Sequence, residues 1–177
     1  LLAKQSDVLA YMATWPEDKA AHRYAEGKWS VVEVVGNMAD TERVFAYRLL
    51  RIARADSTPL SGFDENAWQL EAGFESRTLA SVVAELKAVR QASLALIRSL
   101  DAAAVERVGL ANDKRVTAKA LVWLIGGHFA HHAAILRDRF ERLRDGDRFW
   151  YEIYLPQDLV RQVRDQTLAR IIRRNTT

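Results

Sequence analysis

The sequence predicts an all-α fold, namely a four-helix bundle with long crossover loops and one additional C-terminal helix. Apolar residues recur at helical spacing in five stretches of the chain. Residue types that favour helix N-caps stand directly before three of these stretches, at Ser30, Thr78 and Thr117. No strand pattern and no internal repeat is found. We expect the bundle to occupy residues 1–145 and an extension to occupy residues 146–177.

The composition excludes several classes of site and partner. The chain has 177 residues, of which 49% are hydrophobic, enough for one well-cored domain. It has no cysteine, which rules out disulfides, thiolate metal ligands and cysteine nucleophiles. The net charge is +3 and the arginines alternate with acidic residues, so we expect no nucleic-acid partner. Neither a signal peptide nor a membrane-spanning apolar run is found, so we expect a cytoplasmic protein with no membrane partner.

The first two helices have clear local signals. The first is expected over Leu1–Trp15, where Pro16 stops it. Ser30 and Glu33 form the capping-box pattern, in which Ser30 is the N-cap and Glu33 reaches back to it. The second helix should run from this box to about Ala55.

A crossover and the third helix follow. Residues 56–76 should form a loop held down by aromatic anchors, either as a structural crossover or as a lid. The third helix is expected over Leu79–Leu100, capped by Thr78. Arg90 falls within its apolar pattern, where it can bind an anionic substrate group or pair with an acid such as Glu42.

The rest of the chain should contain a loop and two more helices. Residues 101–116 are expected to be a loop. The fourth helix is expected over Ala118–Leu143, with Asp145-Gly146-Asp147 ending it. The extension carries an amphipathic stretch at Leu159–Ile172, expected as a helix packed on the bundle or on a partner subunit.

The fourth helix carries three of the four histidines, and two of them share a face. His128 and His132 lie one turn apart, with Leu121, Leu124, Ile125 and Ile135 around them. We therefore expect both imidazoles to face the bundle interior. Such an i, i+4 pair can chelate a divalent ion. It can equally be two core histidines bonded to the backbone or to a carboxylate.

The second helix offers polar side chains for the same site. Asn37 lies at the edge of its apolar stripe, with Glu33 one turn before it and Asp40 beside it. We expect Asn37 to meet His128 and His132 across the two helices.

Four segments carry a resemblance to a known family. They are Gly27-Lys28-Trp29-Ser30-Val31-Val32-Glu33, Asp40-Thr41-Glu42-Arg43 with Ala46-Tyr47-Arg48, Pro59-Leu60-Ser61-Gly62-Phe63-Asp64, and the stretch from Gly127 to Leu136 with its histidines. Residues 1–143 resemble, on these segments, the DinB/YfiT-like superfamily of metal-binding four-helix bundles. The resemblance implies a homodimer that holds nickel or zinc on three histidines and acts as a transferase, isomerase or hydrolase on a small molecule.

The resemblance assigns metal ligands to three positions, and one of them is altered. The second-helix ligand falls at Asn37, and the fourth-helix pair falls on His128 and His132. An amide oxygen is a weaker ligand for zinc or nickel than an imidazole, so the site is expected to be weakened or lost. Glu33, Asp40 or water could complete the metal's ligand shell.

Three functions follow from this altered site. The first is a metal-dependent transferase or hydrolase with a weakened site. The second is a metal-free pocket, engineered or diverged, in which His128 or His132 is a general base oriented by Glu33 or Asp40, or a ligand-binding group. The third is a structural or interaction bundle without catalysis.

The end of the chain and the back of the fourth helix carry two further expectations. Tyr151–Leu159 is similar to the segment that precedes the first helix in family members, and with the start at Leu1 this indicates a rearranged or engineered chain. Small or apolar residues lie opposite the histidine pair at Gly126, Gly127, Phe129, Ala130, Ala133 and Ala134. We expect the extension or a second subunit to cover this face.

Overall fold

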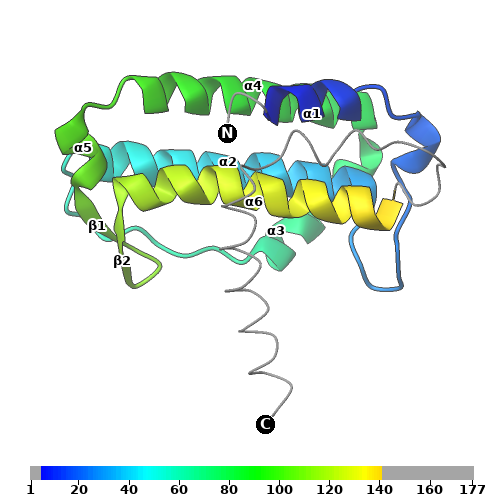
Figure 1. Cartoon of the computed structure of the whole chain (residues 1–177). Coiled ribbons are helices and arrows are strands. Elements are labelled where there is room, and N and C mark those ends of the chain that lie inside the picture. Colours follow the sequence, from blue (N-terminus) through cyan, green and yellow to red (C-terminus); the bar gives the residue numbers. More distant parts are fainter. Residues whose placement is uncertain (1–4, 141–177) are drawn as a thin grey trace, which may run out of the picture.

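The computed structural model describes residues 5–140, in which four helices form the bundle. They are α1 (Gln5–Met12), α2 (Val31–Ala53), α4 (Leu79–Arg98) and α6 (Ala118–Phe140). Figure 1 shows α1 beside α4 and α2 beside α6, and α2 packs against both α4 and α6. The all-α bundle predicted from the sequence is confirmed. The predicted end of the fourth helix and the whole extension lie outside the described residues.

The predicted helix starts are formed by the expected hydrogen bonds. The Ser30 backbone N–H donates to Glu33 Oε2 at 2.7 Å, while Ser30 Oγ accepts from the Glu33 N–H, so the capping box is complete. Thr78 Oγ1 accepts from the Ser81 N–H at 3.2 Å. Thr117 Oγ1 accepts from the Ala120 N–H at 3.0 Å. All three predicted caps are confirmed.

The connections contain more secondary structure than expected. Between α2 and α4 lie α3 (Glu65–Glu71) and the 3-10 turn η2 (Phe74–Ser76), and a similar turn, η1 (Glu17–Lys19), precedes α2. Between α4 and α6 lie α5 (Ala102–Glu106) and an antiparallel hairpin of β1 (Val108–Ala111) and β2 (Lys114–Thr117).

The prediction that the chain has no strand was therefore wrong. Each strand has four residues, too few to show alternation. Asn112 and Asp113 have φ of 51° and 58°, so the pair expected to break structure makes the hairpin turn. The Leu60 N–H donates to Leu110 O and the Asn112 N–H donates to Leu60 O, both at 2.9 Å, so the 56–76 crossover is fastened to the hairpin.

The inward face of α6 differs from the expected one. Leu121, Ile125, Phe129 and Leu136 are fully buried, whereas Leu124, expected beside the histidines, is 46% exposed. The expectation that Phe129 and Ala133 lie on an outer face was wrong, because both belong to the core. The fully buried residues of α6 lie on the helix face that contains Phe129. His128 and His132 therefore lie at the edge of the core and are only partly buried. The buried Gly126 carbonyl accepts from Gln5 Nε2 of α1 at 3.0 Å, so the bundle itself covers this part of the face.

A buried ion pair joins the helices at the centre of the bundle. Arg90 is 0% exposed and Glu42 is 3% exposed, and their Nη2 and Oε2 atoms lie 2.8 Å apart. Arg90 Nη1 donates to Gln5 Oε1, and its guanidinium lies 4.6 Å from the Phe129 ring centre. The predicted pairing of Arg90 with Glu42 is confirmed.

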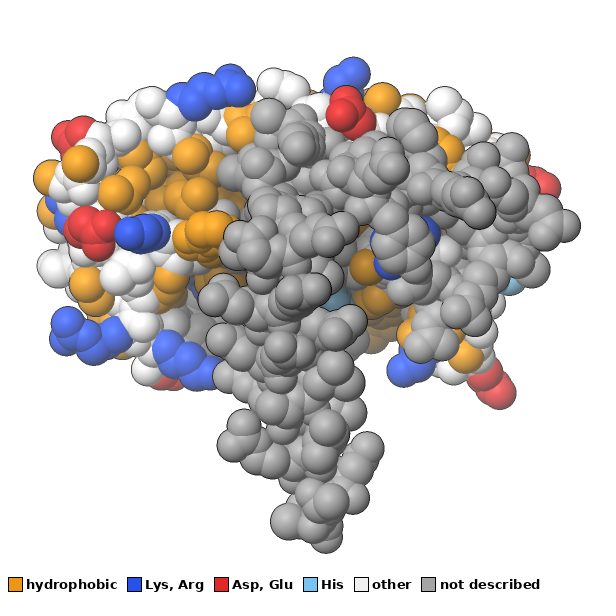
Figure 2. Space-filling model, in the orientation of Figure 1, with side chains coloured by type: hydrophobic (Ala, Val, Ile, Leu, Met, Phe, Trp, Pro, Cys, Tyr) orange, Lys and Arg blue, Asp and Glu red, His pale blue; other side chains and the backbone are white. Residues whose placement is uncertain are grey.

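The surface of the bundle carries both signs of charge. On the described part of the face in Figure 2, Lys and Arg side chains are dispersed and interspersed with Asp, Glu and apolar groups. Among residues 5–140, no helix is both long and apolar enough to cross a membrane.

Breaking the central ion pair should strongly destabilise the fold. Glu42→Gln leaves the buried Arg90 without its counter-ion, so we expect the free energy of unfolding to fall by about 3–5 kcal/mol. The matched control is Glu106→Gln, which removes an exposed pair with Lys119 and should cost less than about 1 kcal/mol. Urea denaturation measures both. Equal losses in the two variants would contradict the central role of the pair.

Two helical glycines should respond to alanine in opposite ways. A Cβ at Gly36 of α2 would collide with the Phe74 ring, whereas a Cβ at Gly127 of α6 would meet nothing within 4 Å. We expect Gly36→Ala to destabilise the protein by about 1–3 kcal/mol and Gly127→Ala to stabilise it by up to about 1 kcal/mol. The melting temperatures of the two variants test this, and a gain in both would mean that Phe74 moves aside freely.

Candidate functional site

One cavity contains the residues that the sequence singled out on α2 and α6. It has a volume of about 510 Å³, and Asn37, His128 and His132 line it together. Its other lining residues come from the bundle and the connections: Trp29, Thr41, Phe45, Arg48, Phe63, Glu65, Asn112 and His131. The packing of α2 against α6 thus brings the amide and the imidazole pair to one place.

The two imidazoles face each other closely. His128 Nε2 and His132 Nε2 lie 3.1 Å apart, and the His128 ring packs edge-on against Phe45 of α2 with ring centres 5.9 Å apart. Two nitrogens at this distance share one hydrogen bond or direct two lone pairs at one ion. In a tetrahedral zinc site, nitrogens that are 2.0–2.1 Å from the metal lie about 3.3 Å apart. The spacing of the pair therefore suits a shared divalent ion.

The protein holds both imidazoles in their neutral form. Burial, together with the smaller effects of the His132, His131 and Arg90 charges, lowers the pKa of His128 from 6.5 to about 3. Burial likewise lowers the pKa of His132 to about 4, with a contribution from His131. A neutral imidazole is the form that binds a metal, so protons do not compete for these nitrogens near pH 7.

Two buried polar atoms of the site lack a hydrogen-bond partner in the described part of the chain. They are Asn37 Oδ1 and His132 Nδ1. A buried polar atom without a partner costs about 1–3 kcal/mol, which a bound ion, water or substrate can offset. Two neutral imidazoles and a free amide oxygen are donors that fit a divalent ion, although the amide is a weak ligand. Within residues 5–140, no cluster of three His, Asp, Glu or Cys side chains is placed to hold a metal.

The structure places Glu33 and Asp40 with other partners. Glu33 Oε2 accepts hydrogen bonds from Ser30 and lies 2.7 Å from Arg23 Nη1. Burial alone would raise the pKa of Glu33, but the Ser30 hydrogen bonds and the Arg23 charge lower it. Asp40 accepts from Arg43 at 3.0 Å and lines a neighbouring cavity. Burial raises the pKa of Asp40 despite Arg43. Neither carboxylate is among the residues that line the histidine cavity.

Arg48 is a residue of the site that the sequence reasoning did not single out. It lines both the histidine cavity and the neighbouring cavity of about 570 Å³. It stands in the family-like Ala46-Tyr47-Arg48 segment, which was the only signal for it. Burial lowers its pKa from 12.5.

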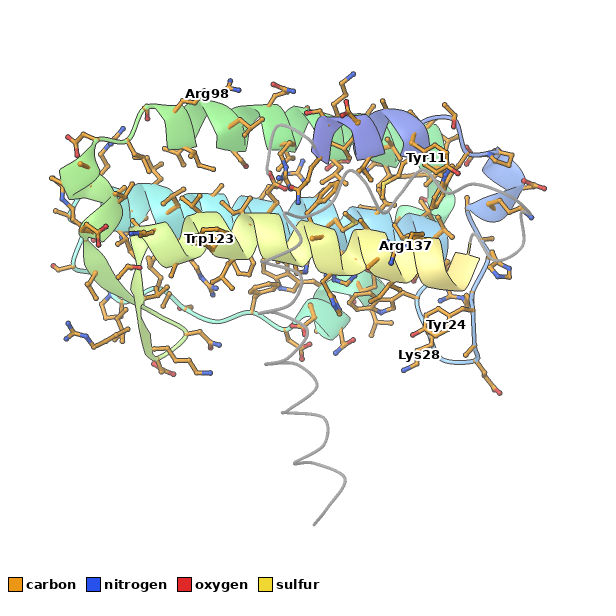
Figure 3. All side chains as sticks on the ribbon, viewed as in Figure 1. Tyr11, Tyr24, Lys28, Arg98, Trp123 and Arg137 are labelled. Atoms are coloured by element: carbon orange, nitrogen blue, oxygen red, sulfur yellow. The ribbon has the colours of Figure 1, made fainter. Side chains whose placement is uncertain are left out.

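A third, smaller cavity opens beside His132. Its volume is about 230 Å³, and Tyr24, Lys28, Trp29 and Ile135 are among its lining residues. Figure 3 shows Tyr24 and Lys28 on the loop before α2, near the end of α6 that carries Arg137. This loop therefore forms one wall of the approach to His132.

Comparison with known proteins separates the chain into two regions. A family model described as the DinB superfamily matches residues 1–136. The structure resembles that of YfiT from Bacillus subtilis, described as a probable metal-dependent hydrolase with an unusual four-helix bundle topology, with a TM-score of 0.62 and 21% identity over 77% of this chain and 83% of that one. At this identity the similarity shows a shared fold.

The C-terminal region is similar to a different family. A model described as animal haem peroxidase matches residues 124–177. The peroxidasin homolog pxn-2 of Caenorhabditis elegans is 50% identical over 42 residues, which are 23% of this chain and 3% of that protein. The two family matches overlap only at residues 124–136.

The histidine pair should make stability depend on pH. Because the pKa values of His128 and His132 lie below 6.5 in the folded state, unfolding takes up protons as the pH falls below about 6.5. With chelator present, the free energy of unfolding should be level above this pH and decrease toward pH 4. The double variant His128→Asn/His132→Asn should flatten this slope, and urea denaturation at several pH values measures it. An unchanged slope in the variant would mean that other groups cause the dependence.

Proposed function

Since the chain belongs to the DinB superfamily, we propose that it is a metal-dependent enzyme of the hydrolase or transferase class that acts on a small molecule. In this proposal Asn37, His128 and His132 hold a divalent ion, nickel or zinc, more weakly than three histidines would. One observation carries it. The Nε2 atoms of His128 and His132 approach to 3.1 Å in a cavity that they share with the unpartnered Asn37 Oδ1.

The side chains nearest the proposed ion have different roles. A bound divalent ion supplies Lewis acidity and lowers the pKa of a water or thiol beside it. Burial keeps the His128 and His132 rings neutral, so each ring has one nitrogen without a proton that can bind the ion. Asn37 Oδ1 completes the protein donors. Phe45 packs edge-on against His128 and limits the rotation of its ring. The similarity to YfiT of Bacillus subtilis, a probable metal-dependent hydrolase, supports the same class of reaction.

The rival functions fit these observations less well. A general base works best when its pKa lies near the working pH, and pKa values of about 3 and 4 make both imidazoles weak bases. Histidines with a purely structural role would normally have their buried nitrogens hydrogen-bonded. His132 Nδ1 and Asn37 Oδ1 lack such partners within residues 5–140. We therefore favour a ligand-binding role for the pair.

Restoring an imidazole at position 37 should strengthen the site. We expect Asn37→His to bind nickel or zinc at least about tenfold more tightly, because a strong ligand replaces a weak one. In metal well above the dissociation constant, the variant should gain about 1.4 kcal/mol of additional stabilisation over wild type, since binding favours the folded state. Metal titration by calorimetry and melting curves with and without metal measure the two effects.

The control for this variant removes the histidine pair. Asn37→His combined with His128→Ala and His132→Ala should lose the gain in affinity. Identical melting temperatures of Asn37→His with and without metal would contradict the proposal.

A further inference from the structure

The histidine cavity and a second, larger cavity are neighbours. Arg48 and Phe63 line both of them, so these two side chains stand at the border between the two spaces. Their volumes of about 510 and 570 Å³ are each in the range of small-molecule sites. A ligand whose reacting end lies at the imidazoles can therefore extend past Arg48 into the second cavity.

Arg48 is a buried cation without a counter-ion in the described part of the chain. It is 7% exposed, and its Nη2 donates to the backbone carbonyl of Ser61 at 2.7 Å, which carries no net charge. No carboxylate of residues 5–140 forms an ion pair with it within 4.0 Å, although Glu65 and Asp40 line the two cavities. An arginine has five N–H donors, and burying a charge without an opposite charge is costly.

The neighbouring arginines show that this arrangement is specific to Arg48. Arg43 also lines the second cavity, but it pairs with Asp40 at 3.0 Å and with Glu85 at 2.6 Å. Arg51 lines the same cavity and pairs with Asp56. Arg48 is also the one of these three arginines that reaches the histidine cavity.

The surroundings of Arg48 indicate what kind of anion it can take. Its guanidinium lies 5.7 Å from the Phe63 ring centre, and the Phe63 and Trp68 rings contact each other at an angle of 41° with their centres 4.9 Å apart. Pro59 and Leu60 extend the same apolar wall. A guanidinium binds a planar carboxylate through two parallel hydrogen bonds, and the aromatic rings suit a flat apolar body.

We propose that Arg48 binds the carboxylate of an aromatic or other apolar acid, whose body lies against Phe63 and Trp68 and whose reacting end points to the histidine cavity. The proposed substrate is therefore an apolar carboxylic acid or a derivative of one. The placement of the reacting end at the histidines rests on the proposed function. The binding of the carboxylate to Arg48 needs no metal.

The test compares acids with their uncharged amides. Wild-type protein is titrated in chelator at pH 7 with benzoate, 3-phenylpropanoate and 2-naphthoate and with the three matching amides, and binding is followed by NMR. We expect at least one acid to bind at least about tenfold more tightly than its amide. Arg48→Gln should remove this preference, while Arg48→Lys should keep part of it, because it retains the charge without the planar fork.

Arg54→Gln is the matched control, because it removes the same charge from an exposed arginine next to α2 that lines neither cavity. It should leave the preference for the acid unchanged. The proposal is overturned if no acid binds wild-type protein, if acids and amides bind equally, or if Arg48→Gln keeps the preference. Melting curves verify that the variants fold, and retained preference in Arg48→Lys would show that a loss in Arg48→Gln is not an unfolding effect. Because the acid titration is carried out in chelator, its failure does not bear on the proposed metal site. That site is tested by the Asn37→His experiment.

Discussion

The buried contact of Arg90 with Glu42 is the constraint on which the rest of the bundle depends. Arg90 of α4 contacts Glu42 of α2, Gln5 of α1 and the Phe129 ring of α6, so a single side chain links its own helix to the other three helices of the bundle. Gln5 adds a second link to α6 through the Gly126 carbonyl. A fully buried guanidinium tolerates few arrangements of its partners, so these contacts fix how far each helix slides and turns against the others.

The same constraint sets the position of the histidines. Phe129 lies under Arg90 and occupies the core, so its neighbour His128 and the next-turn His132 are turned to the edge, toward α2. There they meet Asn37 at a cavity and not in the packed interior. Arg90 also contributes to the lowered pKa of His128, which links the structural ion pair to the electrostatics of the site.

Local chemistry made much of the fold predictable. Caps such as Ser30 with Glu33 depend on residues three positions apart, and the i, i+4 spacing of His128 and His132 follows from the helical repeat. The hairpin was missed because its strands are short and because a long-range contact holds them. Leu60 of the 56–76 crossover forms a β-bridge with Ala111 of β1. The pairing of Glu33 with Arg23 was also missed, because the connection before α2 brings Arg23 to this carboxylate only in the folded chain.

The sequence by itself determined the four bundle helices, the predicted caps, the family and the choice of Asn37, His128 and His132 as the candidate site. Only the tertiary structure decided that Phe129 is in the core, that Leu124 is exposed and that Arg48 is buried with no ion pair to a carboxylate of residues 5–140. The reason is physical. Hydrogen bonds within a helix join near neighbours in the chain, whereas burial and charge pairing depend on segments that meet only when the helices pack.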